Sequence, residues 1–348
     1  MQRVLLVIVL LMLLAASLAV GTLAAAWPFW SRAMAWHVAP EGWPATLPGP
    51  VRELRGADSP TPLVVHVDPG LAKLAIASHA QLLLVADGPA TARGFFAAGY
   101  NERSRVDGRG LAPGLLPLVY TALEQQHPGV LDEPLRNHLP EWSRDPRGNI
   151  TPRQLMWGLS GLAGATQRTW NPFSPQAQLL AGPDFMRAAL AVRQDYPAGT
   201  THTPSPANAQ LLALLAVRLS SRDYADLLEG LVWRVIAADG ARATLDHPRG
   251  QVAAHCCISA SAADWLRVAL LLAQSGQAAQ IGRDHPVNPG QGLVWRVEHV
   301  DDGELLLLYS TGRVLAAAPA SGRALLWVGE GELPVEQVMR LLGLVATK

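Results

Sequence analysis

The first thirty residues form the longest apolar stretch of the chain. After Arg3, no charged residue occurs until Arg32. Residues 4–26 exceed the roughly 20 residues with which a helix crosses a bilayer, and Trp27 follows where an interfacial aromatic belt would lie. The alanines just before Trp27 also resemble a signal-peptidase site, which is the alternative. We therefore expect residues 1–30 to be a signal anchor or a signal peptide.

Prolines are concentrated in the next segment, residues 31–62. A stretch with this many prolines is typical of a stiff, extended linker. We expect it to separate the N-terminal segment from a folded domain that occupies residues 63–348. The prolines of the segment are Pro40, Pro44, Pro48, Pro50, Pro60 and Pro62.

The hydrophobic pattern of residues 63–348 changes twice along the chain. Short apolar runs come first, apolar residues at helical spacing dominate the middle, and short alternating runs with a final amphipathic helix close the chain. This order predicts an α+β fold, in which an antiparallel sheet is built from both chain ends and a helical subdomain is inserted. The predicted strands are 81–86, 93–98, 292–298, 304–309, 313–318 and 324–329, and the predicted helices are 111–126, one that opens at Thr151, 208–219, 223–237, 261–275 and 334–345.

Two of the predicted helices carry clear start signals. Thr151 supplies a hydroxyl N-cap and is followed by proline at the first helical position. Ser261 precedes an aspartate at the spacing of a capping box. The helix at 111–126 is less regular, because Pro113 and Pro117 fall within its first two turns.

The composition indicates a folded protein without a surface for nucleic acid. Hydrophobic residues make up 49% of the chain and charged residues 16%, which excludes disordered and coiled-coil classes. Basic and acidic residues number 28 each, so the formal net charge is zero and no basic face is implied. Lys73 and Lys348 are the lysines of the chain, and the other basic residues are arginines.

The two cysteines of the chain, Cys256 and Cys257, are adjacent. Side chains of neighbouring residues diverge at Cβ, so we expect no disulfide between them but a buried pair of small hydrophobic residues. His255 precedes them, yet the chain has no CxxC or HxxxH spacing that would indicate a metal site. We expect neither a metal nor a cofactor.

Several strings in the domain resemble the serine β-lactamase and penicillin-binding superfamily, and in particular its branch of class C-like esterases and 6-aminohexanoate-dimer hydrolases. The resemblance extends over residues 81–342 and implies the β-lactamase/transpeptidase-like α+β fold. It rests on the order of the strings, since no single one is diagnostic. The strings are 131–135 with 139–142, 150–155 with 159–162, 196–200, 207–212 and 259–265.

The first catalytic element of that superfamily is not matched in this chain. Its nucleophile is the serine of an S-x-x-K motif at the start of a helix, and the lysine takes the hydroxyl proton. The resemblance aligns Gly110 with the serine and Pro113 with the lysine. No S-x-x-K occurs elsewhere, because Lys73 has Gly70 at the required spacing.

The second and third elements also differ. Pro204 aligns with the tyrosine of the second element, of which Asn208 is retained. Ser310-Thr311-Gly312 aligns with the K-T-G or H-x-G of the third, so that the glycine is kept without the cation. The resemblance therefore implies a family framework with degenerate catalytic positions at Gly110, Pro113, Pro204 and Ser310. The residues that it places along the former cleft are His202, Ser205, Asn208, Thr311 and Gly312.

Other polar residues have less specific signals. Ser160 lacks the G-x-S-x-G pattern of a nucleophile elbow and is expected to end a helix. A His202–Ser205 pair could activate a hydroxyl, but no carboxylate that would orient the histidine is identifiable. Glu102 and Asp107 could form an acid–base pair, although we expect them to be solvated loop charges.

The sequence favours a non-catalytic binding protein of the cell envelope. Its expected ligand is a cell-wall fragment or another small amide or ester, and its expected contact with the membrane is through residues 4–26. The protein partner stays open, and nucleic acid is not expected. We expect a bacterial inner-membrane protein with a periplasmic body, or a secreted one after signal cleavage. The alternatives are a hydrolase of esters or amides rebuilt around His202, Ser205 or Ser310, and a structural protein with a filled cleft.

Overall fold

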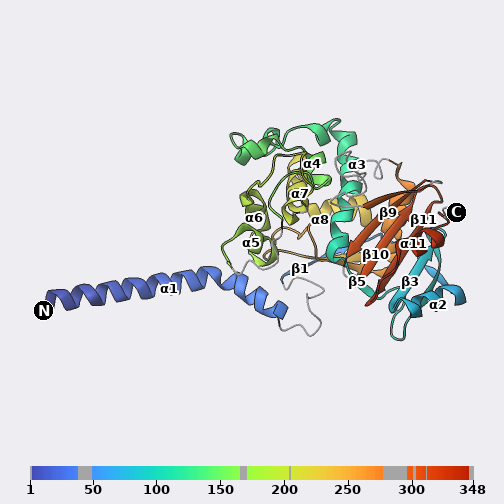
Figure 1. Ribbon diagram of the computed structural model, residues 1–348, viewed down its shortest axis with the longest axis horizontal. Coiled ribbons are helices and arrows are strands. Elements are labelled where there is room, and N and C mark those ends of the chain that lie inside the picture. Colours follow the sequence, from blue (N-terminus) through green and yellow to red (C-terminus); the bar gives the residue numbers. More distant parts are fainter. Residues whose placement is uncertain are drawn as a thin grey trace.

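The computed structural model contains a mixed α+β body and one long helix that extends from it (Figure 1). The predicted site residues Pro204 and Thr311, and positions 292–295 of a predicted strand, lie outside the described residues. The structure describes residues 2–37, 49–164, 171–203, 205–276, 296–300, 303–310 and 312–344.

The long helix is α1, Gln2–His37. Its segment Val7–Met34 is long and apolar enough to cross a membrane, a property that membrane anchors share with signal sequences. Most of its large side chains face away from the body, and Leu23, for example, is 66% exposed. The apolar N-terminal helix that the sequence predicts is therefore confirmed.

The main sheet has seven strands in the order β2-β4-β3-β11-β10-β9-β8. Its central pairing joins β3 to β11, so that the beginning and the end of the domain share one sheet, as predicted. Neighbouring strands are antiparallel except β2 and β4, which are parallel. The strands are β2 (Val64–Val67), β3 (Ala80–Ala86), β4 (Thr91–Phe96), β8 (Arg296–Val300), β9 (Gly303–Ser310), β10 (Arg313–Ala318) and β11 (Arg323–Gly329).

Helices cover both faces of this sheet. Leu82 and Leu84 of β3 point into the larger core, to which α9 (Ala262–Gln274) contributes. Leu83 and Val85 point the other way, into a second core with α2 (Pro69–Ala77) and α11 (Val335–Leu341). Burial on both sides explains why this strand is a continuous apolar run without alternation.

A smaller antiparallel sheet has the order β1-β6-β7-β5. Strand β1 pairs with β6 from Val51 opposite Thr244 to Arg55 opposite Gly240. It therefore lies within residues 31–62, so part of the segment predicted as a linker belongs to the folded body. The strands are β1 (Val51–Arg55), β5 (Arg105–Asp107), β6 (Gly240–Thr244) and β7 (Ile258–Ser261).

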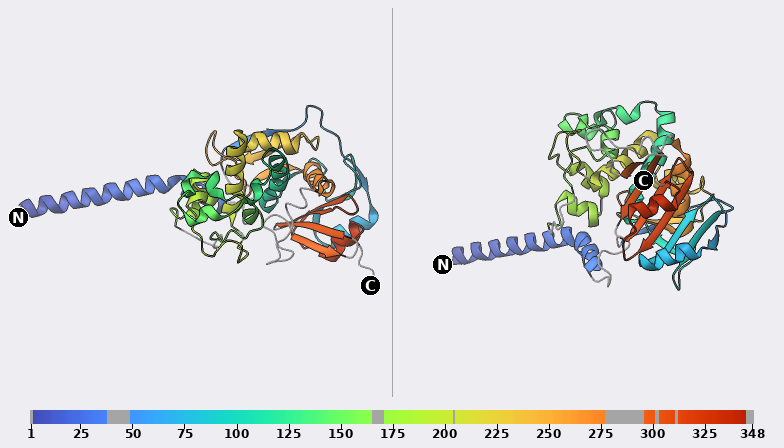
Figure 2. Two further views of the ribbon diagram at one scale, coloured as in Figure 1. Left: turned by 90° about the horizontal axis from the view of Figure 1, so that it is seen from above. Right: turned by 45° about the vertical axis from the view of Figure 1, so that its right-hand side comes forward.

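The predicted helical subdomain lies between β5 and β6 in the chain and packs beside the sheets (Figures 1 and 2). Its central helix is α7, which is buried along most of its length. The N-cap predicted at Thr151 is confirmed, and the structure adds that Thr151 and Gln154 form a capping box. The α-helices are α3 (Leu116–Gln126), α4 (Pro152–Met156), α5 (Pro175–Ala181), α6 (Phe185–Ala191), α7 (Pro206–Ser220) and α8 (Tyr224–Leu228).

Two predicted helices are less regular than expected. Residues Arg109–Leu115 form a 3-10 helix, η1, and α3 begins only at Leu116, where Pro117 fits the first turn. Proline at 113 explains the break, because it cannot donate an intrahelical hydrogen bond. The helix predicted to end at residue 237 changes after Leu228 into a single π-helical turn.

The prediction for the cysteines is wrong. Cys256 and Cys257 form a disulfide, with their Cα atoms 3.7 Å apart. Cys257 has a φ of 68°, in the left-handed region. The expectation of diverging side chains assumed an ordinary extended or helical backbone, and this backbone turn removes that assumption.

Candidate functional site

The chain enters the candidate site through Gly108, which follows β5. Its N–H donates to the carbonyl of Ile258 over 2.6 Å. A Cβ at this position would lie 2.3 Å from that oxygen and 2.5 Å from the ring of Trp265. Glycine is therefore required here, and the tight contact fixes where η1 begins.

Trp265 of α9 packs against the same junction, the point at which β5 leads through Gly108 into η1. Its side chain is fully buried, and its Nε1 donates to the carbonyl of Val106 in β5 over 3.0 Å. Its ring meets that of Trp233 edge to face, with centroids 6.1 Å apart. The prediction of a solvated loop charge is wrong for Asp107, which is 5% exposed beside this junction.

Gly110 lies two residues into this ordered start and faces strand β9. Its N–H donates to Oγ of Ser310 over 3.2 Å. A Cβ on Gly110 would lie 3.3 Å from both Cβ and Oγ of Ser310. The structure thus brings together the positions aligned with the family's nucleophile and with its third element. Pro113 follows in η1 and is half-buried.

Gly312 follows Ser310 in the turn from β9 to β10. Its φ is +71°, and a Cβ there would lie 2.5 Å from the carbonyl oxygen of Gly329. The retained glycine is therefore required by the turn between these strands.

The remaining predicted residues contact the turn at 158–163 instead. Ser160 and Asn208 are fully buried, and Ser160 Oγ donates to Asn208 Oδ1 over 2.7 Å. Ser205 Oγ donates to the carbonyl of Ala163, also over 2.7 Å. Both serine hydroxyls therefore hold the turn, in agreement with the structural role predicted for Ser160.

His202 lies in the same segment but is not paired with Ser205. Its Nε2 is enclosed and has no hydrogen-bond partner among the described residues, and the same holds for Thr203 Oγ1 and Asn208 Nδ2. Burial lowers the pKa of His202 from its ordinary value. Burial thus disfavours the protonated form of this histidine, and the hydroxyl of Ser205 donates to the carbonyl of Ala163 and not to the imidazole.

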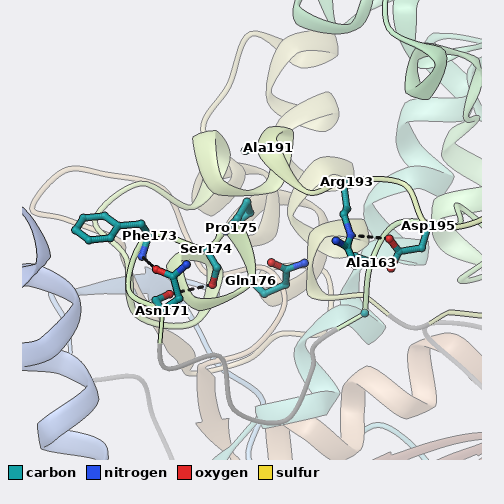
Figure 3. A pocket seen from close by; sticks show the side chains of 10 residues that line it. Ala163, Asn171, Phe173, Ser174, Pro175, Gln176, Ala191, Arg193 and Asp195 are labelled. Carbon is teal, nitrogen blue, oxygen red and sulfur yellow. Dashed lines mark hydrogen bonds and ion pairs between the residues drawn. The ribbon is translucent and has the colours of Figure 1, made fainter.

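A cavity of about 620 Å³ lies at the start of α5 (Figure 3). Its wall includes Phe173, Gln176 and an exposed ion pair in which Arg193 Nε is 2.7 Å from Asp195 Oδ1. A second cavity, of about 440 Å³, shares Arg193. Of the predicted site residues that the structure describes, none lines either cavity. The sequence carried no motif at these positions, so they were missed.

The described residues contain no group of three or more His, Cys, Asp or Glu side chains that could hold a metal.

His255 gives the body a pH-dependent stability. Its Nδ1 is 3.1 Å from Gln210 Oε1, and burial lowers its pKa from 6.5 to about 4. Between these values the unfolded chain binds a proton that the folded chain does not, so stability is complete above pH 6.5 and is lost as the pH falls to about 4. We expect a loss of about 2–3 kcal/mol.

Thermal unfolding of the full chain in detergent at pH 7 and pH 4.5 measures this loss. The variant His255→Gln should lose clearly less stability on acidification than the wild type does. His66→Gln, at an exposed position of strand β2, is the matched control and should behave as the wild type. Equal losses in the wild type and in His255→Gln would contradict the assignment.

Solved structures share the fold of this chain. A protein of Bacillus anthracis, named provisionally as a 6-aminohexanoate-dimer hydrolase, superposes with a TM-score of 0.68 at 14% identity, over 85% of this chain and 89% of its own. A penicillin-binding protein from Bacillus halodurans gives 0.58 at 13% identity, over 78% and 99%. A D-stereospecific amidohydrolase from a Streptomyces species gives 0.53 at 15% identity, over 75% and 92%. At such identities the likeness shows the fold alone.

The sequence itself matches a family model. The chain matches none of the curated proteins with which it was compared. The model named Beta-lactamase, however, matches residues 118–330, which is more than half of the chain. The match begins after Gly110 and Pro113 and includes α7 and strand β9, which carries Ser310. The chain belongs to the β-lactamase family.

Proposed function

We propose that this chain is a membrane-anchored, non-catalytic member of the β-lactamase family that acts by binding a ligand. The observation that carries the proposal is the contact between Gly110 and Ser310. The position aligned with the family's nucleophile has no side chain, and its amide donates to Ser310 Oγ. That amide is therefore engaged where an acyl-transfer site needs free donors for a developing oxyanion.

The proton chemistry of the family is also missing from this position. A serine nucleophile needs a neighbouring base, and residue 113, where the family has its lysine, is a proline. Lys73 is an exposed residue of α2, a helix that packs on the second core, on the opposite face of the sheet from α9. We propose that Pro204 completes the loss at the second element.

One observation favours the alternative of a rebuilt hydrolase. Ser310 Oγ lies beside the start of η1, close to where the family's hydroxyl would be. Ser160 and Ser205 are less suitable nucleophiles, because both are buried and donate to oxygen atoms of the protein. If hydrolysis occurs, we therefore expect its nucleophile to be Ser310.

The ligand that we propose is a small amide or ester, such as a fragment of the cell wall. This proposal is supported by the family's fold and by the exposure of Gly110, the position aligned with the nucleophile, to solvent. We propose that the body lies in the periplasm of a bacterium, held by α1 at the inner membrane. Secretion after cleavage of the N-terminal segment is the alternative.

Calorimetric titration of the full chain in detergent tests the binding function. The probes are the 6-aminohexanoate dimer and a cell-wall peptide. We expect at least one of them to bind, and Ser310→Tyr, which places a bulky ring beside Gly110, to weaken binding about tenfold or more, or about 1.4 kcal/mol.

Arg193→Ala, at the cavity beside α5, is the control and should bind as the wild type does. Absence of binding for both probes would contradict the proposed ligand class. Binding that Ser310→Tyr leaves intact and Arg193→Ala abolishes would move the ligand to the other cavity.

A further inference from the structure

The body end of α1 is built differently from the rest of the helix. The helix contains Pro28, a residue that kinks helices because it cannot donate an intrahelical hydrogen bond. Figure 1 shows α1 bending near its body end, beside α5. Away from the body the side chains of α1 are exposed, as Leu23 is at 66%, whereas near the body Ala26, Phe29 and Ala33 are only 4%, 6% and 7% exposed.

The residues beyond Pro28 pack on α5. Phe29 and Ala33 form a separate apolar cluster with two alanines of that helix, Ala177 and Ala181. The small side chains of α5 let the two helices approach closely. This cluster is distinct from the two cores that stabilise the sheets.

Arg32 adds hydrogen bonds to the contact between α1 and the body. Its guanidinium donates to the carbonyl of Gly182, at the end of α5, over 2.8 Å, and also to the carbonyl of Asp246. The Asp246 side chain is 1% exposed and accepts from the amides of Phe185 and Gln251 over 3.0 and 2.7 Å. Arg32 is thus bound to an ordered part of the body.

The length of the apolar segment sets the level of this contact. A bilayer core takes up about 20 helical residues, which places its boundary near Trp27 if the span begins at Val7. Phe29 lies two residues further, or about 3 Å along the helix axis. With the span beginning at Val7, the contact with α5 falls at the level of the lipid headgroups, in the last part of the apolar segment Val7–Met34.

Another apolar side chain lies on the same side of the body. Phe173, just before α5, is 57% exposed, and Figure 3 shows it pointing toward the side on which α1 lies. Figure 1 places α5 and α6 on the side from which α1 extends, and α2 at the far side.

We infer that the body is held against the bilayer in one orientation, by the contact of α5 with α1 and by the exposed ring of Phe173, and does not swing on the proline-rich segment. The occupant of this surface is the lipid headgroup layer. The inference rests on the proposed membrane anchoring. The α1 residues that contact the body, Phe29, Arg32 and Ala33, come before residues 38–48 in the chain, so this later segment does not separate the anchor from the contact. The cavity at Phe173 then lies beside the membrane.

Site-directed fluorescence on the full chain tests the docking. The chain is reconstituted into vesicles of phosphatidylethanolamine and phosphatidylglycerol that contain headgroup spin-labelled lipid. Both native cysteines form a disulfide, so a maleimide dye labels an introduced thiol. Phe173→Cys carries the dye at the docking surface, and Ile76→Cys, on α2 and 67% exposed, is the matched control.

We expect quenching of the dye at position 173 and none at position 76. Arg32→Ala or Phe29→Ala, which change α1 and leave the body's own residues intact, should reduce the quenching at 173 to the control level. Absence of quenching at 173, or equal quenching at both positions, would overturn the docking.

Flotation of the same vesicles distinguishes a failure of the docking from a failure of the membrane anchoring. A protein that floats with the vesicles but shows no quenching at position 173 is anchored without being docked. A protein that does not float refutes the anchoring and, with it, the docking.

Discussion

Arg267→Ala is expected to destabilise the body by about 3–5 kcal/mol, because it leaves a buried carboxylate without its partner. Arg267 is 5% and Asp264 0% exposed, with Nη1 3.0 Å from Asp264 Oδ1. The same guanidinium donates to the carbonyl of Pro89 over 3.1 Å and to that of Thr61. It therefore joins α9 to the turn between β3 and β4 and to the segment before β2.

Chemical denaturation of the full chain in detergent measures this effect. Burial raises the pKa of the Asp264 carboxyl, against the opposing effects of Ser261 and Arg267, so the isolated carboxyl should partly relieve its cost by taking up a proton at low pH. The double variant Asp264→Leu/Arg267→Met should be clearly more stable than Arg267→Ala. A cost below about 1 kcal/mol for Arg267→Ala, as for a surface ion pair, would contradict the buried pair.

Gly108→Ala is expected to cost about 3 kcal/mol, which combines overpacking with the weakening of one buried hydrogen bond. The added methyl group would meet the carbonyl of Ile258 at 2.3 Å, and neither this backbone nor the packed ring of Trp265 can retreat easily. Relief of the clash would shift η1 and separate Gly110 from Ser310.

The unfolding midpoint in denaturant reports this cost. Gly276→Ala is the matched control, because a Cβ there would meet no atom of the described residues within 4 Å, and it should leave the midpoint nearly unchanged. Equal effects of the two substitutions would show that the junction at Gly108 is not tightly packed.

The order of elements could be predicted because each depends on local pattern. The strand at 81–86 is a continuous apolar run, and Thr151 and Ser261 do cap their helices as expected. Strand β1 could not be predicted, because its partner β6 lies almost 190 residues away in the chain, and a pairing over such a distance leaves no signal in the local sequence. A proline-rich neighbourhood then favoured a linker.

The candidate site was predictable only in part. The adjacency of Gly110 and Ser310 agrees with the resemblance, which aligned both positions with catalytic elements. The burial of Asp107 and the disulfide between Cys256 and Cys257 could be seen only in the folded backbone. The sequence does not indicate whether a strand residue is exposed, nor that Cys257 adopts a left-handed conformation. The contact of α1 with α5 could not be predicted either, because it is made largely by alanines, and alanine occurs in helices of every kind.

Covalent labelling of the full chain tests the central claim most directly. The protein in detergent is treated with a fluorophosphonate and with a penicillin, beside an active serine β-lactamase, and its intact mass is measured before and after. A non-catalytic body predicts no adduct in the wild type or in Ser310→Ala, while the active enzyme is fully labelled. A stoichiometric adduct on one serine of the wild type, lost in Ser310→Ala if that serine is Ser310, would contradict the account and identify a rebuilt nucleophile.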